Sequence, residues 1–450
     1  MLKNALHFEE LPYQPDSARL FAAVRELPQP LFLDSCHPWS SRGRFDILAA
    51  DPVRDFSFNL SNSSSYKDIR DFFELLSDEH NRYCNDLVGH PEMLPFCGGL
   101  AGCLDYELGR PLQYLPAQPA QAASVYLYDW AVIQDHLRQR TTLVSLPGVS
   151  SRRRDDVLSR LKDTPVTSGS APFSLLGGFL PDLERKDYAS AFDRVQSYIH
   201  AGDSYQVNLA RRFSADFEGD PWLAYQVLRP LAAAPFSGFF DSGDRQLLCL
   251  SPERFLRLSG RRVETSPIKG TRPRSDDASV DAAAAAELQA SPKDRAENLM
   301  IVDLLRNDIG RNCVPGSVQV ERLFDLESYP TVHHLVSTIS GEISPAADAL
   351  TLLRDSFPGG SITGAPKRRA MEIIEELESG PRQAYCGSLF YVSADGRMDS
   401  NIAIRSLVCE RGSIHCWGGG GIVADSECGL EFQESWDKIG RFIDALEAMV

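Results

Sequence analysis

The chain has 450 residues, of which 43% are hydrophobic and 24% charged, as in an ordinary globular protein with a large core. Its formal net charge of −16 argues against binding to nucleic acid or to an anionic membrane surface. No apolar run approaches membrane-spanning length, so we expect neither a nucleic-acid-binding nor a membrane protein.

The N-terminal segment and the cysteines indicate a cytoplasmic protein. Residues 1–10 carry acids where an export signal needs a basic and then an apolar run. The 10 cysteines form no CxxC pair, which in a chain of this length is typical of buried, reduced thiols.

Two strand-like runs, 31–35 and 43–52, open the first half on either side of a polar loop. The serine, arginine and aromatic residue around this loop could line a small pocket, although a plain hairpin with a long connection is the simpler interpretation. Between residues 147 and 172 the composition changes to Ser, Arg, Asp and Gly. This change predicts a boundary between a first subdomain, 1–165, and a second, 180–450.

The second half opens with a helix followed by strands. Apolar residues recur at helical spacing from Tyr188 to Ile199, and residues 204–210 then alternate as a strand does. A strand ending near Leu256 and its hairpin partner at 262–265 would bring Glu253 and Lys269 into one neighbourhood. Opposite charges at strand ends are candidates for an acid and a nucleophile, with a plain salt bridge as the alternative.

Lys269 stands among turn-forming residues, at the predicted end of a strand that begins near Arg262. Pro267 cannot extend a ladder, and Gly270 lets the backbone approach a ligand. A lysine held in such a turn can act as a nucleophile when its surroundings lower its pKa. The alternative is a surface lysine beside a turn.

Ser291 and Pro292 predict the start of a helix, as N-cap and first-turn proline. Its segment 299–305 is so apolar that we expect the helix to be largely buried. Glu297 would then be an acid near a core, where acids are usually paired or coordinated.

The run 358–367 is not a nucleotide-binding loop, because Ala365 stands where the Walker pattern requires lysine. The run should instead open a helix through Ala370 and Ile374, whose free amide groups could receive a carboxylate.

Near the C-terminus, a loop with four glycines at 418–421 is followed by a helix. Its buried stripe is predicted to contain Phe432, Trp436, Ile439 and Ile443. A second stripe consists of Glu431, Glu434 and Lys438. Alone this stripe indicates a solvated face, but beside a glycine loop it would suit Mg²⁺, which takes one or two carboxylates together with water and substrate oxygens.

Taken together, these segments resemble the chorismate-utilising enzymes. The resemblance implies an α+β fold in which two intertwined subdomains form an α/β sandwich of large, mainly antiparallel sheets. The matching runs are 251–255, 267–271, 294–311, 333–338, 358–367 and 419–426 with Glu434 and, more sparsely, 33–35, 44–47 and 98–110.

Two positions separate the branches of this family. Anthranilate synthases usually carry alanine where Lys269 stands, and isochorismate and salicylate synthases place a water-activating lysine where this chain has Gln206. The resemblance therefore favours the branch that forms aminodeoxychorismate from chorismate and ammonia. The alternatives are component I of anthranilate synthase and, in another class, a tryptophan-binding regulatory protein without catalysis.

The resemblance also implies roles for individual residues. Lys269 would attack C2 of chorismate while Glu253 protonates the leaving C4 hydroxyl, and His334 would lie near the ring, unless it is a hydrogen-bonded core histidine. Mg²⁺ would be held by Glu297 and Glu434, with Glu431 and Asp294 in support. Further contacts to the substrate would come from Gly270, Thr271, Tyr385, Arg405, Gly419, Gly420, Gly421 and Lys438.

A tryptophan pocket and a partner subunit are implied in the same way. The pocket would be lined by Ser35, Arg44, Phe45, Pro235, Phe236 and Ser237, and a bound tryptophan there could be structural rather than inhibitory. The chain shows no recognisable glutaminase segment, so ammonia would come from a separate glutamine amidotransferase subunit, component II.

Overall fold

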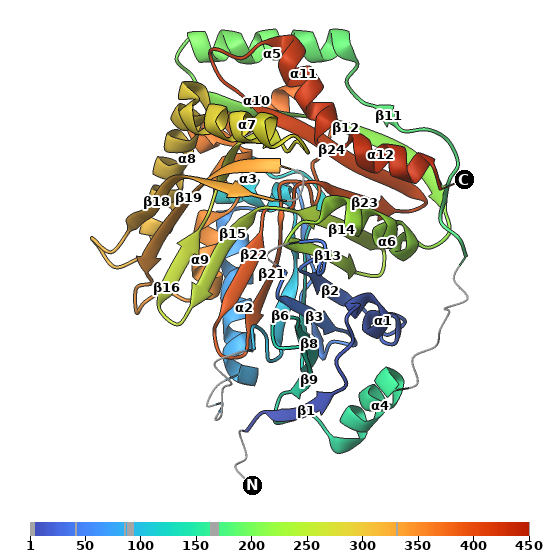
Figure 1. Cartoon of the computed structure of the whole chain (residues 1–450). Coiled ribbons are helices and arrows are strands. Elements are labelled where there is room, and N and C mark those ends of the chain that lie inside the picture. Colours follow the sequence, from blue (N-terminus) through green and yellow to red (C-terminus); the bar gives the residue numbers. More distant parts are fainter. Residues whose placement is uncertain are drawn as a thin grey trace.

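The computed structural model describes residues 5–40, 43–84, 87, 94–162, 171–329 and 332–449. Two large antiparallel sheets form the centre of the molecule (Figure 1). The first has 13 strands. They are β1 (His7–Leu11), β2 (Leu31–Asp34), β3 (Phe45–Ala49), β8 (Trp130–Asp135), β9 (Arg140–Ser145), β10 (Ser174–Leu175), β11 (Leu180–Pro181), β12 (Gln206–Glu218), β13 (Phe236–Asp241), β14 (Arg245–Ser251), β20 (Gly364–Ala365), β23 (Ser406–Glu410) and β24 (Ser413–Ile422).

The second sheet has 11 strands. They are β4 (Arg54–Asp55), β5 (Phe58–Leu60), β6 (Gly99–Leu104), β7 (Ala120–Tyr128), β15 (Arg254–Ser259), β16 (Arg262–Thr265), β17 (Ile268–Pro273), β18 (Gln319–Ser328), β19 (Val332–Glu342), β21 (Ser388–Ser393) and β22 (Met398–Asn401). Every strand pair in both sheets for which a register is defined is antiparallel.

Helices cover the outer faces of the sheets (Figure 1). They are α1 (Ser17–Ala22), α2 (Tyr66–Cys84), α3 (Gly109–Leu112), α4 (Ser151–Lys162), α5 (Arg185–His200), α6 (Pro221–Ala232), α7 (Ala278–Ala290), α8 (Pro292–Gly310), α9 (Ala349–Ser356), α10 (Lys367–Leu377), α11 (Cys428–Asp437) and α12 (Gly440–Glu447), with the 3₁₀ turns η1 (Tyr106–Leu108) and η2 (Gly360–Ile362). In the described ranges no helix is both long and apolar enough to cross a membrane.

Alternation along the strands of the first sheet divides its side chains between two cores. Leu31 and Ile47 face the second sheet and belong to the core between the sheets. Their neighbours Phe32 and Leu48 face the opposite way and pack with Phe21 of α1 and Trp222 of α6. This period of two is what an antiparallel sheet covered on both faces requires. The fold is therefore α+β, as the resemblance implied.

Strands from distant parts of the chain lie side by side in both sheets. β2 pairs with β13 in the first sheet, and β6 pairs with β21 in the second. The segments 1–165 and 180–450 thus contribute strands to the same two sheets, while residues 163–170 at their predicted boundary lie outside the described residues. The division into two subdomains stays a prediction.

Several local predictions are confirmed. The hairpin of β15 and β16 forms with Arg257 opposite Glu264. β2 and β3 are neighbours, with Leu33 opposite Ile47. Ser291 caps α8, since its hydroxyl oxygen accepts a hydrogen bond from the amide of Asp294 at 3.2 Å. The run that ends at Lys367 opens α10.

Other local predictions are wrong, each because of tertiary pairing or packing. Lys269 does not end the strand that begins at Arg262; it lies within a separate strand, β17, paired with β19. The glycines 418–421 are not a loop but belong to β24, paired with β12. Helix α8 buries only one face, and its Leu299 is 46% exposed.

The predicted C-terminal helix is interrupted, because α11 ends at Asp437 and α12 begins at Gly440. Ile439 and Ile443 are buried as expected, but Trp436 is 36% exposed. A Cβ at Gly440 would meet the Trp436 ring at 2.6 Å, so the glycine allows the indole to fold back over the break.

Candidate active site

A bulge in β17 places Lys269. The pairing of β17 with β19 slips between Ile268 and Thr271, and Gly270 inside the slip has φ +82°. A Cβ at Gly270 would stand 2.9 Å from Oδ1 of Asp294, so the position favours glycine for both backbone and space. The strand therefore approaches α8 closely beside Lys269.

The amine of Lys269 lies among acids. Its Nζ is 3.0 Å from Oε1 of Glu297 and donates to the carbonyl oxygen of Ser361 at 3.2 Å. Burial opposes the charged form, but the neighbouring carboxylates of Glu297 and Glu253 raise the pKa of Lys269. In this arrangement the lysine is an ammonium ion, which must lose a proton before it can act as a nucleophile.

Glu253 approaches the same point from the segment between β14 and β15. It is buried, and its Oε1 accepts a hydrogen bond from the hydroxyl of Ser361 at 2.8 Å. Burial raises the pKa of Glu253, although Ser361 and Lys269 oppose the shift. Glu253 and Lys269 therefore meet at one residue, as the predicted hairpin required, and Glu253 has the environment of a general acid.

Glu297 and two further carboxylates lie close to the glycines of β24. A Cβ at Gly420 would lie 3.0 Å from Oε2 of Glu431 and 3.4 Å from Oε1 of Glu434. A Cβ at Gly421 would lie 3.0 Å from Oε1 of Glu297. Without side chains, these glycines leave the space in which the acids of α8 and α11 meet.

These acids suit a divalent cation, although they do not form a complete protein cage. Among the described residues no three His, Cys, Asp or Glu side chains are close enough to hold a metal ion. Mg²⁺ needs only one or two carboxylates when water and substrate oxygens complete its shell. Burial raises the pKa of Glu431, and its neighbour Glu434 adds to the shift. A cation would relieve this repulsion, so the donor set fits Mg²⁺.

Positive charges balance these acids. Nζ of Lys438 is 2.7 Å from Oε1 of Glu434 and donates to the carbonyl oxygen of Gly419 at 2.7 Å. Burial opposes ionisation, yet Lys438 lowers the pKa of Glu434. Asp294, the predicted supporting acid, pairs at 3.0 Å with Arg272 instead.

The other side of the site can receive an anion. Arg405 is half-buried with φ +51°, and its guanidinium makes no hydrogen bond or ion pair with any part of the chain that the structure describes. Burial and the nearby Arg441 lower its pKa to about 10. A guanidinium without a carboxylate partner is suited to a substrate carboxylate.

Backbone amides of β24 can assist in binding an anion. The amides of Asn208 and Ala210 on β12 donate away from β24, to Thr363 and Glu378. Their partners in the ladder, Gly421 and Gly419, therefore form non-hydrogen-bonded pairs and direct their own amides away from β12.

Tyr385 and His334 are both buried. The Tyr385 ring stacks on Trp417 with centroids 5.8 Å apart. His334 shares a hydrogen bond of 2.8 Å between its Nδ1 and the hydroxyl of Thr271. Burial, with Arg405 nearby, lowers the pKa of His334 to about 3, so the imidazole is neutral at physiological pH.

Ser361, the residue that contacts both Lys269 and Glu253, was not predicted from the sequence. It lies in η2, inside the run 358–367, which drew attention only for its glycines and its helix start. The available signal was a serine directly after a pair of glycines, which is too common to be specific.

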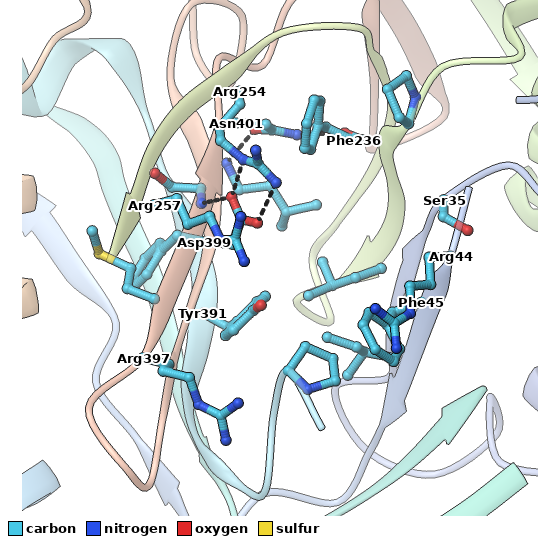
Figure 2. Close-up of a pocket in the computed structure, with 18 of the residues that line it drawn as sticks. Ser35, Arg44, Phe45, Phe236, Arg254, Arg257, Tyr391, Arg397, Asp399 and Asn401 are labelled. Atoms are coloured by element: carbon cyan, nitrogen blue, oxygen red, sulfur yellow. Dashed lines mark hydrogen bonds and ion pairs between the residues drawn. The ribbon is translucent and has the colours of Figure 1, made fainter. Parts of the chain in front are cut away.

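All six residues predicted for a tryptophan pocket line one cavity of about 610 Å³ between the two sheets. Figure 2 shows Ser35, Arg44 and Phe45 on one wall, opposite Arg257 and Tyr391. Arg44 pairs with Asp135 at 3.0 Å, and Arg254 pairs with Asp399 at 2.9 Å. The structure thus gathers these residues, which the sequence separates by about 200 positions, while the identity of the ligand stays a prediction.

Comparison with known proteins identifies the family. The family described as chorismate binding enzyme matches residues 29–444. Aminodeoxychorismate synthase component 1 of Salmonella typhimurium is 44% identical over 452 residues, which cover 97% of each chain. The protein of that name from Escherichia coli is 43% identical over 97% of this chain and 98% of its own. Anthranilate synthase component 1 of Thermus thermophilus is 38% identical over 90% of each chain.

Solved structures show the same fold. Anthranilate synthase component I of Streptococcus pneumoniae superposes with a TM-score of 0.75 at 28% identity, over 90% of this chain and 93% of its own. The menaquinone-specific isochorismate synthase of Escherichia coli has a TM-score of 0.73 at 17% identity, over 98% of this chain and 94% of its own. The chain belongs to the chorismate-binding enzyme family.

Proposed function

We propose that this chain is the chorismate-converting component of an aminodeoxychorismate synthase, which forms 4-amino-4-deoxychorismate from chorismate and ammonia for para-aminobenzoate and folate synthesis. The observation that carries the proposal is the convergence of Lys269 and Glu253 on Ser361. The relatives at 43–44% identity carry the corresponding name.

Chorismate is a cyclohexadiene with a hydroxyl at C4 and two carboxylates. After losing a proton to water, the amine of Lys269 attacks C2, both ring double bonds shift towards C4, and the C4–oxygen bond breaks. Glu253 gives its proton to the departing oxygen, which leaves as water. Ammonia then attacks C4, both double bonds shift back, and the C2–nitrogen bond breaks to restore Lys269. Glu253, now a carboxylate, can take the proton that ammonia loses.

The remaining residues bind and orient the substrate. Arg405 and the outward amides of Gly419 and Gly421 take the pyruvyl carboxylate, with Tyr385 beside them. Gly270 and Thr271 contact the chorismate ring, and neutral His334 lies beside the ring as a hydrogen-bonding group. Glu297 and Glu434 would hold Mg²⁺, with Glu431 in support, and the bound ion supplies a Lewis acid for the ring carboxylate.

Three finer proposals concern the partner, the cavity and the compartment. A glutamine amidotransferase subunit supplies ammonia, as the component naming of the relatives supports. Tryptophan binds in the cavity between the sheets, whose six predicted residues support that assignment. The ten cysteines are free and nine of them are buried, which supports a cytoplasmic protein.

Product analysis tests the main proposal. The purified chain with chorismate, Mg²⁺ and ammonium should yield aminodeoxychorismate, which keeps its enolpyruvyl ether. Fluorescent anthranilate as the product would instead assign the chain to the anthranilate branch. With glutamine in place of ammonium, turnover should require the amidotransferase subunit. No turnover together with tight tryptophan binding in calorimetry would favour the regulatory alternative.

A further inference from the structure

We propose that Ser361 is a positioning residue of this reaction, which orients the catalytic acid Glu253 through its hydroxyl and the amine of Lys269 through its backbone carbonyl. The inference rests on the proposed function. It assigns a role to a residue outside the predicted catalytic, substrate and metal groups.

The segment around Ser361 is anchored on both sides. Thr363 donates its hydroxyl to the carbonyl oxygen of Gly359 at 3.1 Å, and its own carbonyl oxygen accepts from the amide of Asn208 at 2.9 Å. Arg382 donates to the carbonyl oxygen of Ile362 at 3.0 Å. The carbonyl of Ser361, between these anchored groups, is the one that meets Lys269.

Close packing fixes the same segment from outside. A Cβ at Gly359 would lie 2.5 Å from Cδ1 of Ile402, and one at Gly360 would lie 2.5 Å from Cδ2 of Leu304 on α8. The two glycines let the backbone press against both neighbours, which leaves little room for Ser361 to shift. A residue held so firmly can set the positions of flexible side chains that bond to it.

The hydroxyl contact also affects the proton on Glu253. Ser361 donates at 2.8 Å in an enclosed site, which favours the carboxylate over the acid. The charged groups that face Glu253 are Lys269, Lys438 and Arg405, all cationic. Burial raises the pKa of Glu253, and the hydrogen bond from Ser361 reduces that rise. The serine therefore helps to keep this pKa in a range where Glu253 can both give and regain a proton.

The test is the pH dependence of kcat/KM for chorismate in Ser361→Ala, measured with Mg²⁺ at a fixed concentration of free ammonia. Loss of the hydroxyl should lower kcat about tenfold with KM within about twofold, as for a hydrogen bond to a charged group. The alkaline limb should move to higher pH, because Glu253 loses a donor that stabilises its ionised form. Ser361→Thr, which keeps the hydroxyl, should retain the wild-type limb, and Ser361→Cys, a weaker donor, should move it less than alanine does.

Ser356→Ala is the matched control. Ser356 is a buried serine five positions earlier, and in the described part of the chain its hydroxyl has no hydrogen-bond partner. This variant should leave the profile unchanged. In a Glu253→Gln background, Ser361→Ala should cause little further loss, because the glutamine can no longer give the proton that the Ser361 hydroxyl positions.

Different outcomes separate this inference from the proposed function. Absence of aminodeoxychorismate with the unsubstituted chain would overturn both. Normal turnover, with a Ser361→Ala profile that superimposes on the wild type or a loss that is fully additive with Glu253→Gln, would overturn the role of Ser361 alone. If circular dichroism shows that Ser361→Ala does not fold, the test uses the alkaline limb of the kcat/KM profile in Ser361→Thr and Ser361→Cys instead.

Discussion

Two lysines of this protein make almost the same contacts in different surroundings. Nζ of Lys367 is 2.8 Å from Oδ2 of Asp308 and donates to the carbonyl oxygen of Ser356 at 3.1 Å. Nζ of Lys269 is 3.0 Å from Oε1 of Glu297 and donates to the carbonyl oxygen of Ser361 at 3.2 Å. Both acids belong to α8. Ser356 is the last residue of α9, and Ser361 lies in the turn η2 that follows it.

The surroundings separate the two pairs. The side chains of Lys367 and Asp308 are 8% and 1% exposed, so this ion pair is buried and connects the start of α10 to α8. Those of Lys269 and Glu297 are 12% and 15% exposed, and Glu253 and Glu434 also act on the lysine. A buried lysine with one buried acid is typical of a structural ion pair. A lysine that is partly exposed and surrounded by several acids is typical of a functional site, because a substrate or a cation can bind to those acids.

Replacing Lys269 should have the largest effect on activity. In Lys269→Ala the proposed nucleophile is absent, so chorismate turnover with ammonium and Mg²⁺ should fall at least about a thousandfold. Stability should change little, because Glu297 keeps a hydrogen bond from Gln206 at 3.2 Å and partial access to water. Turnover and urea denaturation measure the two effects. Retention of a tenth of the activity would remove Lys269 from the chemistry.

Replacing Lys367 should instead have its main effect on stability. Lys367→Ala leaves the buried carboxylate of Asp308 without its cation, which should lower the free energy of unfolding by about 3–5 kcal/mol. Adding Asp308→Asn should restore part of the loss, because the remaining group is neutral. Urea denaturation measures both variants, and a loss below about 1 kcal/mol would contradict the assignment of a buried ion pair.

The pH dependence of activity tests the role proposed for Glu253 beside Lys269. Burial raises the pKa of Glu253, so its acid form persists above the ordinary carboxyl range and kcat/KM should fall as pH rises through that pKa. In Glu253→Gln, kcat should drop about a hundredfold, and the alkaline limb due to this group should disappear. A pH profile of each protein decides, and an unchanged limb in the glutamine variant would assign the titration to another residue.

Glu107 is the structural counterpart of Glu253 and should show the smallest effect. Burial raises the pKa of Glu107 from 4.5 to about 7, with the nearby charge of Asp105 adding to the shift. A carboxyl whose folded pKa is raised stabilises the fold least above that pKa. Its unfavourable contribution therefore develops as pH rises from about 4.5 to about 7.

Glu107→Gln removes this titration. The variant should gain stability relative to the wild type by about 1–3 kcal/mol at pH 8, with no comparable gain at pH 4. Thermal melts across that range, with turnover as a control for the active site, would test it. A difference in melting temperature that does not depend on pH would show that the pKa of Glu107 is the same in the folded and the unfolded protein.

Local chemistry in the sequence was sufficient to predict many elements and to indicate the family. Ser291 and Pro292 start a helix because capping depends on adjacent residues. The hairpin of β15 and β16 forms across a short turn, which brings Glu253 toward Lys269. The motifs around these residues indicated the family that the comparisons identify.

Tertiary structure alone decided features that depend on partners distant in the chain. Gly418–Gly421 became a strand because β12, about 200 residues earlier, supplied the ladder. Leu299 remained exposed although its helix is apolar, because only one face of α8 meets the sheet. Ser361 contacts Lys269 and Glu253 only because three separate segments of the chain pack together, and no local pattern encodes such a contact.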